Sequence, residues 1–109
     1  MTQPTICSID SVFLAAVLDE ISRARTKHPH FEITLAAMGE EFGEVCKAML
    51  DERAERVWDE CVQLAAMALK LAVDGDRSME AWRNKRQLGG VGRLGPLESP
   101  LTHSKGGTA

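Results

Sequence analysis

The sequence predicts an all-α protein, a small antiparallel bundle of about four helices followed by a Gly/Pro-rich tail. Residues 44–74 contain neither Gly nor Pro and are rich in Ala, Leu, Met, Glu and Lys, which are good helix formers. Strand signals are scarce, because the chain has no Tyr and no sustained alternation of β-branched residues. Apolar residues instead recur at steps of three and four, which is the spacing of one helix face.

The first helix is expected over about residues 11–27, with Ser8 or Ser11 as its cap. Its apolar stripe consists of Phe13, Leu14, Val17, Leu18 and Ile21. Pro29 ends this helix, because a residue that precedes proline avoids the helical region. The second helix is expected over about residues 31–50. Its stripe consists of Leu35, Met38, Phe42, Val45, Cys46 and Met49.

The third helix is expected over about residues 55–73 and is apolar nearly all round, which is typical of a central helix. Residues 74–76 end it, because Gly75 follows the last turn. A short fourth helix is expected over about residues 78–87, with Ser78 as its cap.

The length of the chain fits one domain, and we assign the helical domain to residues 1–87. Residues 88–109 are rich in Gly, Pro, Ser and Thr and are interpreted as a flexible tail or an arm that packs on another subunit. Residues 90–95 match the pattern GxGxxG. That pattern indicates dinucleotide binding only between a strand and a helix, so we reject it here.

The charge and the ends of the chain exclude several classes of function. A net charge of -3 predicts no nucleic-acid partner and no membrane-surface partner. No apolar run reaches the ~20 residues that span a bilayer. The N-terminus lacks the basic start of a signal peptide, so we expect a cytoplasmic protein. The three cysteines include no CxxC pair, which argues against a disulfide framework and a zinc site.

Two acidic segments suggest chemistry. Glu41 and Glu44 are three residues apart, so both carboxylates lie on one helix face, and a bound cation would relieve their repulsion. Glu60 stands on the most apolar helix, where a carboxylate must be paired, protonated or metal-bound. If the second and third helices form an antiparallel hairpin that turns at residues 51–54, Glu44 falls level with Glu60. By the same geometry, Glu41 falls level with Gln63.

The hairpin would bring together three carboxylates and one amide oxygen, which are hard ligands suited to Mg²⁺ or Mn²⁺. Two alternatives remain open. Acidic residues on helices usually form a solvated face. If the two helices were one continuous rod, Glu44 and Glu60 would lie about 24 Å apart and no site would form.

At these residues the sequence resembles the MazG-like family of all-helical nucleoside triphosphate pyrophosphohydrolases, whose signature is ExxE, a spacer and ExxD. Glu41 and Glu44 match the first half of this signature, and Glu60 matches the third acid. The flanking segments LAAMGEEFGEVCKAML and DECVQLAAMALKLA agree, and the resemblance covers roughly residues 14–75. Gln63 stands where the family usually has Asp, which predicts weaker metal binding or a lost activity.

The resemblance implies Mg²⁺-dependent hydrolysis of a nucleoside triphosphate to the monophosphate and pyrophosphate. It also implies a homodimer or homotetramer with sites near subunit contacts. One of the three glutamates would orient or deprotonate the attacking water, and we favour Glu44. The implied metal ligands are Glu41, Glu44, Glu60 and Gln63, and the implied substrate-binding residues are Lys47, Gln63 and Lys70.

Other functions remain open at this point. A catalytically silent relative would bind nucleotide or only oligomerise, and Gln63 favours it. An unrelated helical interaction module would bury its apolar third helix between subunits and would not respond to metal. A diiron bundle would need an ExxH pair, and neither Glu41 nor Glu60 has a histidine three residues later.

Overall fold

The computed structural model describes residues 5–27 and 34–92, and all regular structure within them is helical. The elements in chain order are α1 (Ser8–Lys27), α2 (Thr34–Asp51), α3 (Ala54–Asp74), the 3₁₀ turn η1 (Arg77–Met79) and α4 (Glu80–Lys85). The all-α prediction is therefore confirmed. None of the helices in this described part of the chain is both long and apolar enough to cross a bilayer.

The observed start of α1 differs from the predicted one, and a local hydrogen bond accounts for it. α1 begins at Ser8, earlier than expected, where the Asp10 carboxylate accepts the backbone N–H of Cys7 at 3.0 Å. The expected break at Pro29 and the expected start of the second helix at residue 31 lie outside the described residues. The same holds for residues 93–109 of the expected tail.

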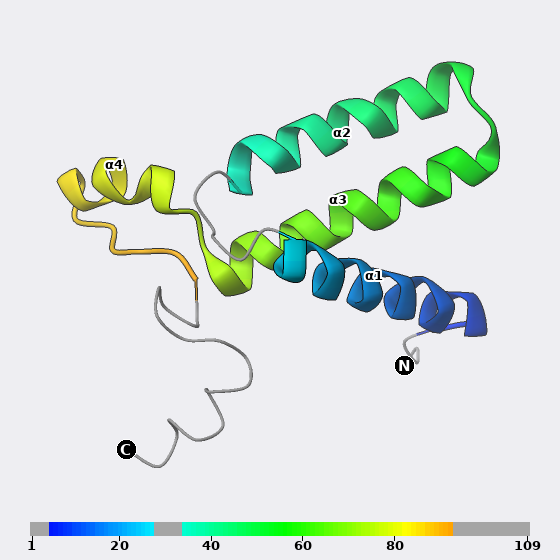
Figure 1. The fold of residues 1–109 in the computed structure, drawn as a ribbon, viewed down its shortest axis with the longest axis horizontal. Helices are drawn as coiled ribbons and strands as arrows, with labels where there is room; N and C mark the ends of the chain where they lie inside the picture. Colours follow the sequence, from blue (N-terminus) through cyan, green and yellow to red (C-terminus); the bar gives the residue numbers. More distant parts are fainter. Residues whose placement is uncertain (1–4, 28–33, 93–109) are drawn as a thin grey trace, which may run out of the picture.

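α3 is the central helix of a single layer. α2 and α3 form an antiparallel hairpin, and α1 runs alongside α3 in the same direction (Figure 1). The helices are interrupted at residues 52–53, which rules out the continuous rod. In the described chain, the backbones of α1 and α2 approach α3 but not each other. A side chain of α1 and a side chain of α2 can therefore meet only by reaching across α3.

The buried core is small and lies between α1 and α3. Val17 and Ile21 pack against Val62 and Ala66, which form its centre. At one end, the rings of Phe13 and Trp58 meet edge to face with centroids 5.1 Å apart. Only six hydrophobic residues are buried among those described, and three of them are alanines. A core of this size leaves much apolar surface exposed.

A polar junction joins three helix ends where α3 stops. We use this name for residues 74–76 together with the side chains and amides that bind them. Arg25 of α1 donates two hydrogen bonds to Asp74, at 3.0 and 2.8 Å. The Thr34 hydroxyl donates to the Gly75 carbonyl at 3.0 Å, and the Leu35 N–H donates to Asp76 at 2.5 Å. The junction thus satisfies free amides of the first turn of α2.

Asp76, rather than Ser78, caps the segment that follows α3. Its Oδ1 accepts the Ser78 N–H at 2.8 Å and the Ser78 hydroxyl at 2.5 Å. The prediction of Ser78 as the cap is wrong. The 3₁₀ turn η1 precedes α4 and contains Ser78, so the side chain that accepts the Ser78 N–H is that of Asp76, two residues before Ser78. Burial opposes ionisation of Asp76, but the hydrogen bonds from Ser78, Leu35 and Thr34 outweigh it and lower the pKa of this carboxyl.

Residues 88–92 return to the end of α3 and cross it. A Cβ added to Gly75, which has φ of 90°, would lie 2.3 Å from the Val91 carbonyl oxygen. A Cβ added to Gly92, with φ of 105°, would lie 2.8 Å from the Asp74 carbonyl oxygen. Two backbones cross here at a distance that only glycine permits. The crossing gives Gly92, part of the rejected GxGxxG pattern, a structural reason.

Candidate functional site: a carboxylate cluster

Three glutamates, one on each of α1, α2 and α3, lie close enough to Glu41 to raise the pKa of its carboxyl. Glu41 is central, because its carboxyl is hydrogen-bonded to that of Glu60 and also feels the charges of Glu44 and Glu20. We call these four residues the carboxylate cluster. Burial is the largest cause that raises the pKa of Glu41 above its usual value, followed by the charge of Glu60. The hairpin therefore places Glu41 within electrostatic reach of Glu44 and Glu60, and the convergence of the predicted ligands on one ion stays a prediction.

The neighbour of Glu60 on α2 is Glu41. The spacing from the turn placed Glu44 level with Glu60, but the carboxyl that lies against Glu60 belongs to Glu41. The physical reason is position around the helix rather than along it. Glu41 is half-buried between α2 and α3, whereas Glu44 is exposed on the flank of α2. A long side chain that faces the neighbouring helix makes contact even when its Cα lies at another level.

Two arginines hold the buried members of the cluster. Arg56 donates to Glu60 at 2.5 Å from one turn earlier on α3. Arg23 forms an ion pair with Glu20 on α1. Glu60 and Glu20 are both buried, so these pairs compensate part of the cost of removing their charges from water. Of the three possibilities that the sequence left for Glu60, the structure shows pairing.

Sequence reasoning missed Glu20, although a signal for it was present. Glu20 falls within the apolar face of α1, between Val17 and Ala24 at helical spacing. A carboxylate in such a face must find a partner, which is the argument already applied to Glu60. What the sequence could not show is that the face of α1 meets the same side of α3 as the acids of α2.

The remaining predicted site residues lie around the cluster. Gln63 is half-buried on α3, one turn after Glu60. Lys47 is paired with Glu52 beside the hairpin turn, and this hydrogen bond and the charge of Glu52 raise the pKa of Lys47. Lys70 is buried, and its Nζ lies 3.6 Å from Asp74 in the polar junction. The two lysines thus flank the cluster at opposite ends of the hairpin.

The donor set of the cluster suits a hard cation, but its present arrangement is not a finished metal site. Within residues 5–27 and 34–92, no three His, Cys, Asp or Glu side chains are placed to hold a metal ion. Two of the four carboxylates are bound by Arg23 and Arg56 instead. Carboxylate oxygens are the ligands that Mg²⁺ prefers, and Glu41 is surrounded by like charges that a cation would neutralise. The donor atoms of the cluster therefore suit magnesium, but their positions in this structure do not form a site for it.

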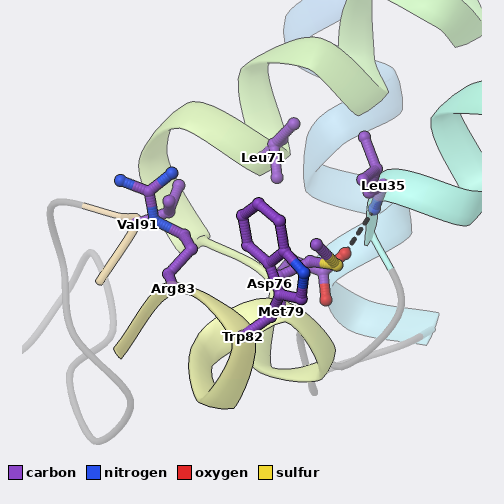
Figure 2. A pocket seen from close by; sticks show the side chains of 7 residues that line it. All are labelled: Leu35, Leu71, Asp76, Met79, Trp82, Arg83 and Val91. Atoms are coloured by element: carbon purple, nitrogen blue, oxygen red, sulfur yellow. Dashed lines mark hydrogen bonds between the residues drawn. The ribbon is translucent and has the colours of Figure 1, made fainter. Parts of the chain in front are cut away.

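An apolar pocket lies at the polar junction. The pocket has a volume of 180 Å³ and opens between the first turn of α2, the end of α3 and α4 (Figure 2). Its lining residues are Leu35, Leu71, Asp76, Met79, Trp82, Arg83 and Val91. The carboxylate of Asp76 already binds the Leu35 amide, and the Arg86 guanidinium lies 3.8 Å from the centre of the Trp82 ring. The Asp76 carboxylate in its lining is thus already committed to structural hydrogen bonds, and the carboxylate cluster is the stronger candidate for catalysis.

The fold and the cluster define an all-helical protein with paired acids at the contact of three helices. Comparison with known proteins adds no relative: no protein-family model, curated protein or solved structure matches the chain. The function must therefore be argued from the cluster itself and from the motif that supplies it.

Proposed function

We propose that the protein is a magnesium-dependent nucleotide pyrophosphohydrolase that converts a nucleoside triphosphate to the monophosphate and pyrophosphate. The observation that carries this proposal is the meeting of four glutamates from three helices around Glu41. Like charges gathered at a helix contact reduce stability, and such arrangements are typical of functional sites. The ExxE motif and its MazG-like context support the same reaction.

Glu41, Glu44 and Glu60 are the residues that would hold magnesium, as the motif implies. Glu20 adds a carboxylate from α1, so the cluster keeps four acids although Gln63 replaces the usual Asp. Gln63 can still offer its carbonyl oxygen to a ligand or a bound water. When bound, the ion would neutralise phosphate charge and polarise the phosphoryl group.

Arg23 and Arg56 are the cations best placed for the phosphates, in place of the lysines that the sequence suggested. Both guanidinium groups bind cluster carboxylates, and both side chains are more than half exposed. A guanidinium binds phosphate oxygens with two parallel hydrogen bonds. We expect the arginines to exchange a carboxylate for phosphate when substrate binds. Lys47 pairs with Glu52 and Lys70 lies against Asp74, at opposite ends of the hairpin, so the phosphates are assigned to the arginines.

The bond to be broken joins the α and β phosphates. Water attacks the α phosphorus, its proton passes to a carboxylate, and pyrophosphate leaves. The sequence favoured Glu44 for this proton. We assign it to Glu41 instead, because burial and the charges of Glu60, Glu44 and Glu20 raise the pKa of its carboxyl, and a raised pKa makes a carboxylate a better proton acceptor.

The test is a panel of nucleoside triphosphates with and without Mg²⁺, in which release of pyrophosphate and of phosphate is measured separately. We expect Mg²⁺-dependent release of pyrophosphate, reduced about 100-fold or more by Glu41→Gln and Glu44→Gln. Glu40→Gln is the matched control, because Glu40 is an exposed neighbour on the same helix. It should change the rate by less than about 3-fold. Equal rates in all variants would contradict the proposal.

One observation favours a second candidate, a silent relative that binds nucleotide without cleaving it. Arg23 and Arg56 already neutralise two cluster carboxylates within the chain, so this part of the fold is not dependent on a metal. This candidate predicts no pyrophosphate release across the panel, even with Mn²⁺. It also predicts that nucleotide raises the melting temperature, whereas a pure interaction module would show no such shift.

A further inference from the structure

The apolar pocket at the polar junction is built from two parts of the chain. Leu35 and Leu71 belong to α2 and α3, whereas Trp82 and Val91 belong to residues 77–92, which leave the end of α3 and return to cross it. Leu35 is 43% exposed and Trp82 is 49% exposed, although both line a concave surface. Apolar side chains exposed around a pocket are typical of a site that a ligand covers. A ligand here would contact both parts of the chain at once.

The volume of the pocket suits one aromatic ring. The pocket holds 180 Å³, and an apolar cavity of about 150 Å³ accepts benzene. Figure 2 shows the Trp82 ring extending toward Leu71 in the middle of the pocket. The Arg86 guanidinium lies over one face of this indole, 3.8 Å from the centre of the ring. A planar ring that packs against the remaining indole surface gains the favourable contact of an aromatic pair.

The part of the chain that closes the pocket is positively charged. Residues 77–92 contain three arginines, one lysine and one acid, whereas the whole chain has a net charge of -3. Arg83 is the cation that lines the pocket itself. Its Nε donates to the Gly89 carbonyl at 2.8 Å and its Nη2 to the Leu88 carbonyl at 3.3 Å. These bonds use two of its five N–H groups and hold the guanidinium in place, so this end of the pocket favours an anionic group.

The acid in the lining lies away from Arg83. Figure 2 shows Arg83 and the carboxylate of Asp76 on opposite sides of the Trp82 ring. Asp76 accepts the backbone N–H groups of Leu35 and Ser78, so the chain itself compensates its charge. An anionic group at the Arg83 end of the pocket is therefore attracted by the guanidinium more than it is repelled by Asp76.

We propose that the pocket binds a small aromatic carboxylate, whose ring packs against Trp82 and whose carboxylate binds Arg83. Trp82 and Arg83 are consecutive residues and line the same pocket of 180 Å³, so the ring and the charge of the ligand must lie within a few bonds of each other. In a nucleotide a sugar separates the base from the phosphate, which makes it the poorer fit. A guanidinium and a carboxylate form two parallel hydrogen bonds. Leu71 lies eleven residues after Glu60 on α3, or about 16 Å along the helix, so this site is separate from the carboxylate cluster.

A bound aromatic acid would fasten residues 77–92 to the helical layer. The close backbone contacts of α4 are with η1 rather than with α1, α2 or α3. A ring held between Trp82 and Leu71 adds a contact between the two parts of the chain. A ligand that binds only the closed arrangement stabilises it increasingly as the ligand concentration rises above Kd. The pocket is thus a site at which a small molecule controls how often this end of the fold opens.

The test follows the indole N–H signals of the two tryptophans by NMR while phenylacetate is added to the full chain. The Trp82 signal, identified by its loss in Trp82→Phe, should shift saturably with a Kd of about 1 mM. The Trp58 signal should stay in place, because Trp58 packs against Phe13 at the contact of α1 with α3. Phenylacetamide has the same shape without the charge and should bind about 10-fold more weakly or worse. Adenosine monophosphate that binds as tightly as phenylacetate would overturn the choice of ligand.

Two charge-removing variants locate the carboxylate of the ligand. Arg83→Gln should weaken the binding of phenylacetate about 10-fold or more and leave that of phenylacetamide unchanged, which separates loss of the charge from damage to the pocket. Lys85→Gln is the matched control, because it removes the same charge from an exposed residue that does not line the pocket. It should change the affinity by less than about 2-fold, since salt screens exposed charges. Equal weakening by both variants would overturn the assignment of Arg83.

A second readout needs no variant. Saturating phenylacetate should slow the exchange of amide hydrogens with deuterium in residues 77–92 of the wild type, and it should leave exchange in the middle of α3 unchanged. Shifts that never saturate, or shifts of both tryptophan signals alike, would overturn the proposal, as would exchange that phenylacetate does not slow. No metal and no hydrolysis enter these measurements, so their outcome is independent of the proposed activity.

Discussion

Asp76 and Glu41 are both carboxyl groups at contacts between helices, but their surroundings differ. Asp76 is buried in the polar junction and accepts hydrogen bonds from Ser78 and from the first turn of α2. Glu41 lies half-buried among three other glutamates. Burial opposes ionisation of both, yet the pKa of Asp76 is lowered and that of Glu41 is raised. Hydrogen-bond donors outweigh burial at the first, and like charges add to it at the second.

This contrast separates a structural acid from a functional candidate. At the polar junction each carboxylate is supplied with donors by the chain itself, so ionisation helps to hold three helix ends together. In the cluster, the chain gathers negative charge and neutralises only part of it. Carboxylates whose charge is only partly neutralised by the chain can be stabilised by a bound ligand. Substitutions at the polar junction and then in the carboxylate cluster test this contrast.

The largest expected effect is that of Asp76→Ala. The substitution removes the acceptor for the Leu35 and Ser78 amides and should lower the free energy of unfolding by about 3 kcal/mol at pH 7. The folded pKa of Asp76 is lowered, so its contribution is present above the unfolded pKa and is lost as pH falls through the folded value. The measurement is urea denaturation from pH 7 to pH 3. Asp19→Ala, at an exposed position on α1, is the control. A loss that is the same at both pH values would assign the effect to packing instead of charge.

An intermediate effect is expected for Gly75→Ala. The backbone at Gly75 has φ of 90° and ψ of -170°, a region that is almost restricted to glycine. The new Cβ would also collide with the Val91 carbonyl. We expect a loss of about 2 kcal/mol, measured by urea denaturation. Gly43→Ala is a matched control, because a Cβ there meets nothing within 4 Å and Gly43 lies inside a helix. It should stabilise the protein by about 1 kcal/mol.

The smallest expected effect has the opposite sign and belongs to Glu41→Gln. The folded pKa of Glu41 is raised, so its carboxyl contributes stability below the unfolded pKa, and that contribution is lost as pH rises through the folded pKa. The charged form therefore destabilises the wild type at pH 7. Glu41→Gln should melt at a higher temperature than the wild type at pH 7, and the difference should shrink below the ordinary Glu pKa of 4.5. If the variant melted at a lower temperature than the wild type at pH 7, charged Glu41 would stabilise the fold as Asp76 does, and the contrast between the two carboxyl groups would be wrong. The same variant should lose the proposed activity, so stability and function would move in opposite directions.

The sequence predicted the architecture because its signals are local. The uninterrupted helix formers of residues 44–74, the charged turn and Gly75 are all read within a few residues of one another. The break at residues 52–53 was expected only as a supposition, since neither Gly nor Pro marks it. The prediction that Ser78 is the cap was wrong because a 3₁₀ turn and an α-helix begin with similar residues. They differ in the position of the side chain that accepts the first backbone N–H.

The candidate site was predicted in part, and the missing part is tertiary. Glu41, Glu44 and Glu60 share two neighbouring helices, so spacing from one turn was enough to bring them together. Glu20 comes from a helix whose contact with α3 depends on packing between Val17, Ile21 and Val62. No local pattern encodes that contact. The arginine partners of Glu20 and Glu60 were missed for a different reason: Arg23 and Arg56 are at ordinary helical spacing, and similar surface pairs are common and weak.

The crossing of Gly75 and Gly92 has a consequence for the motions of the chain. η1 and α4 lie between these two glycines, and α4 makes its close backbone contacts with η1 rather than with α1, α2 or α3. Residues 77–92 therefore form a closed loop that is attached to the layer mainly at its own base. Such a loop can open as one cooperative unit while the contacts of α1 and α2 with α3 stay intact. Its amides should exchange with solvent deuterium well before those of α3.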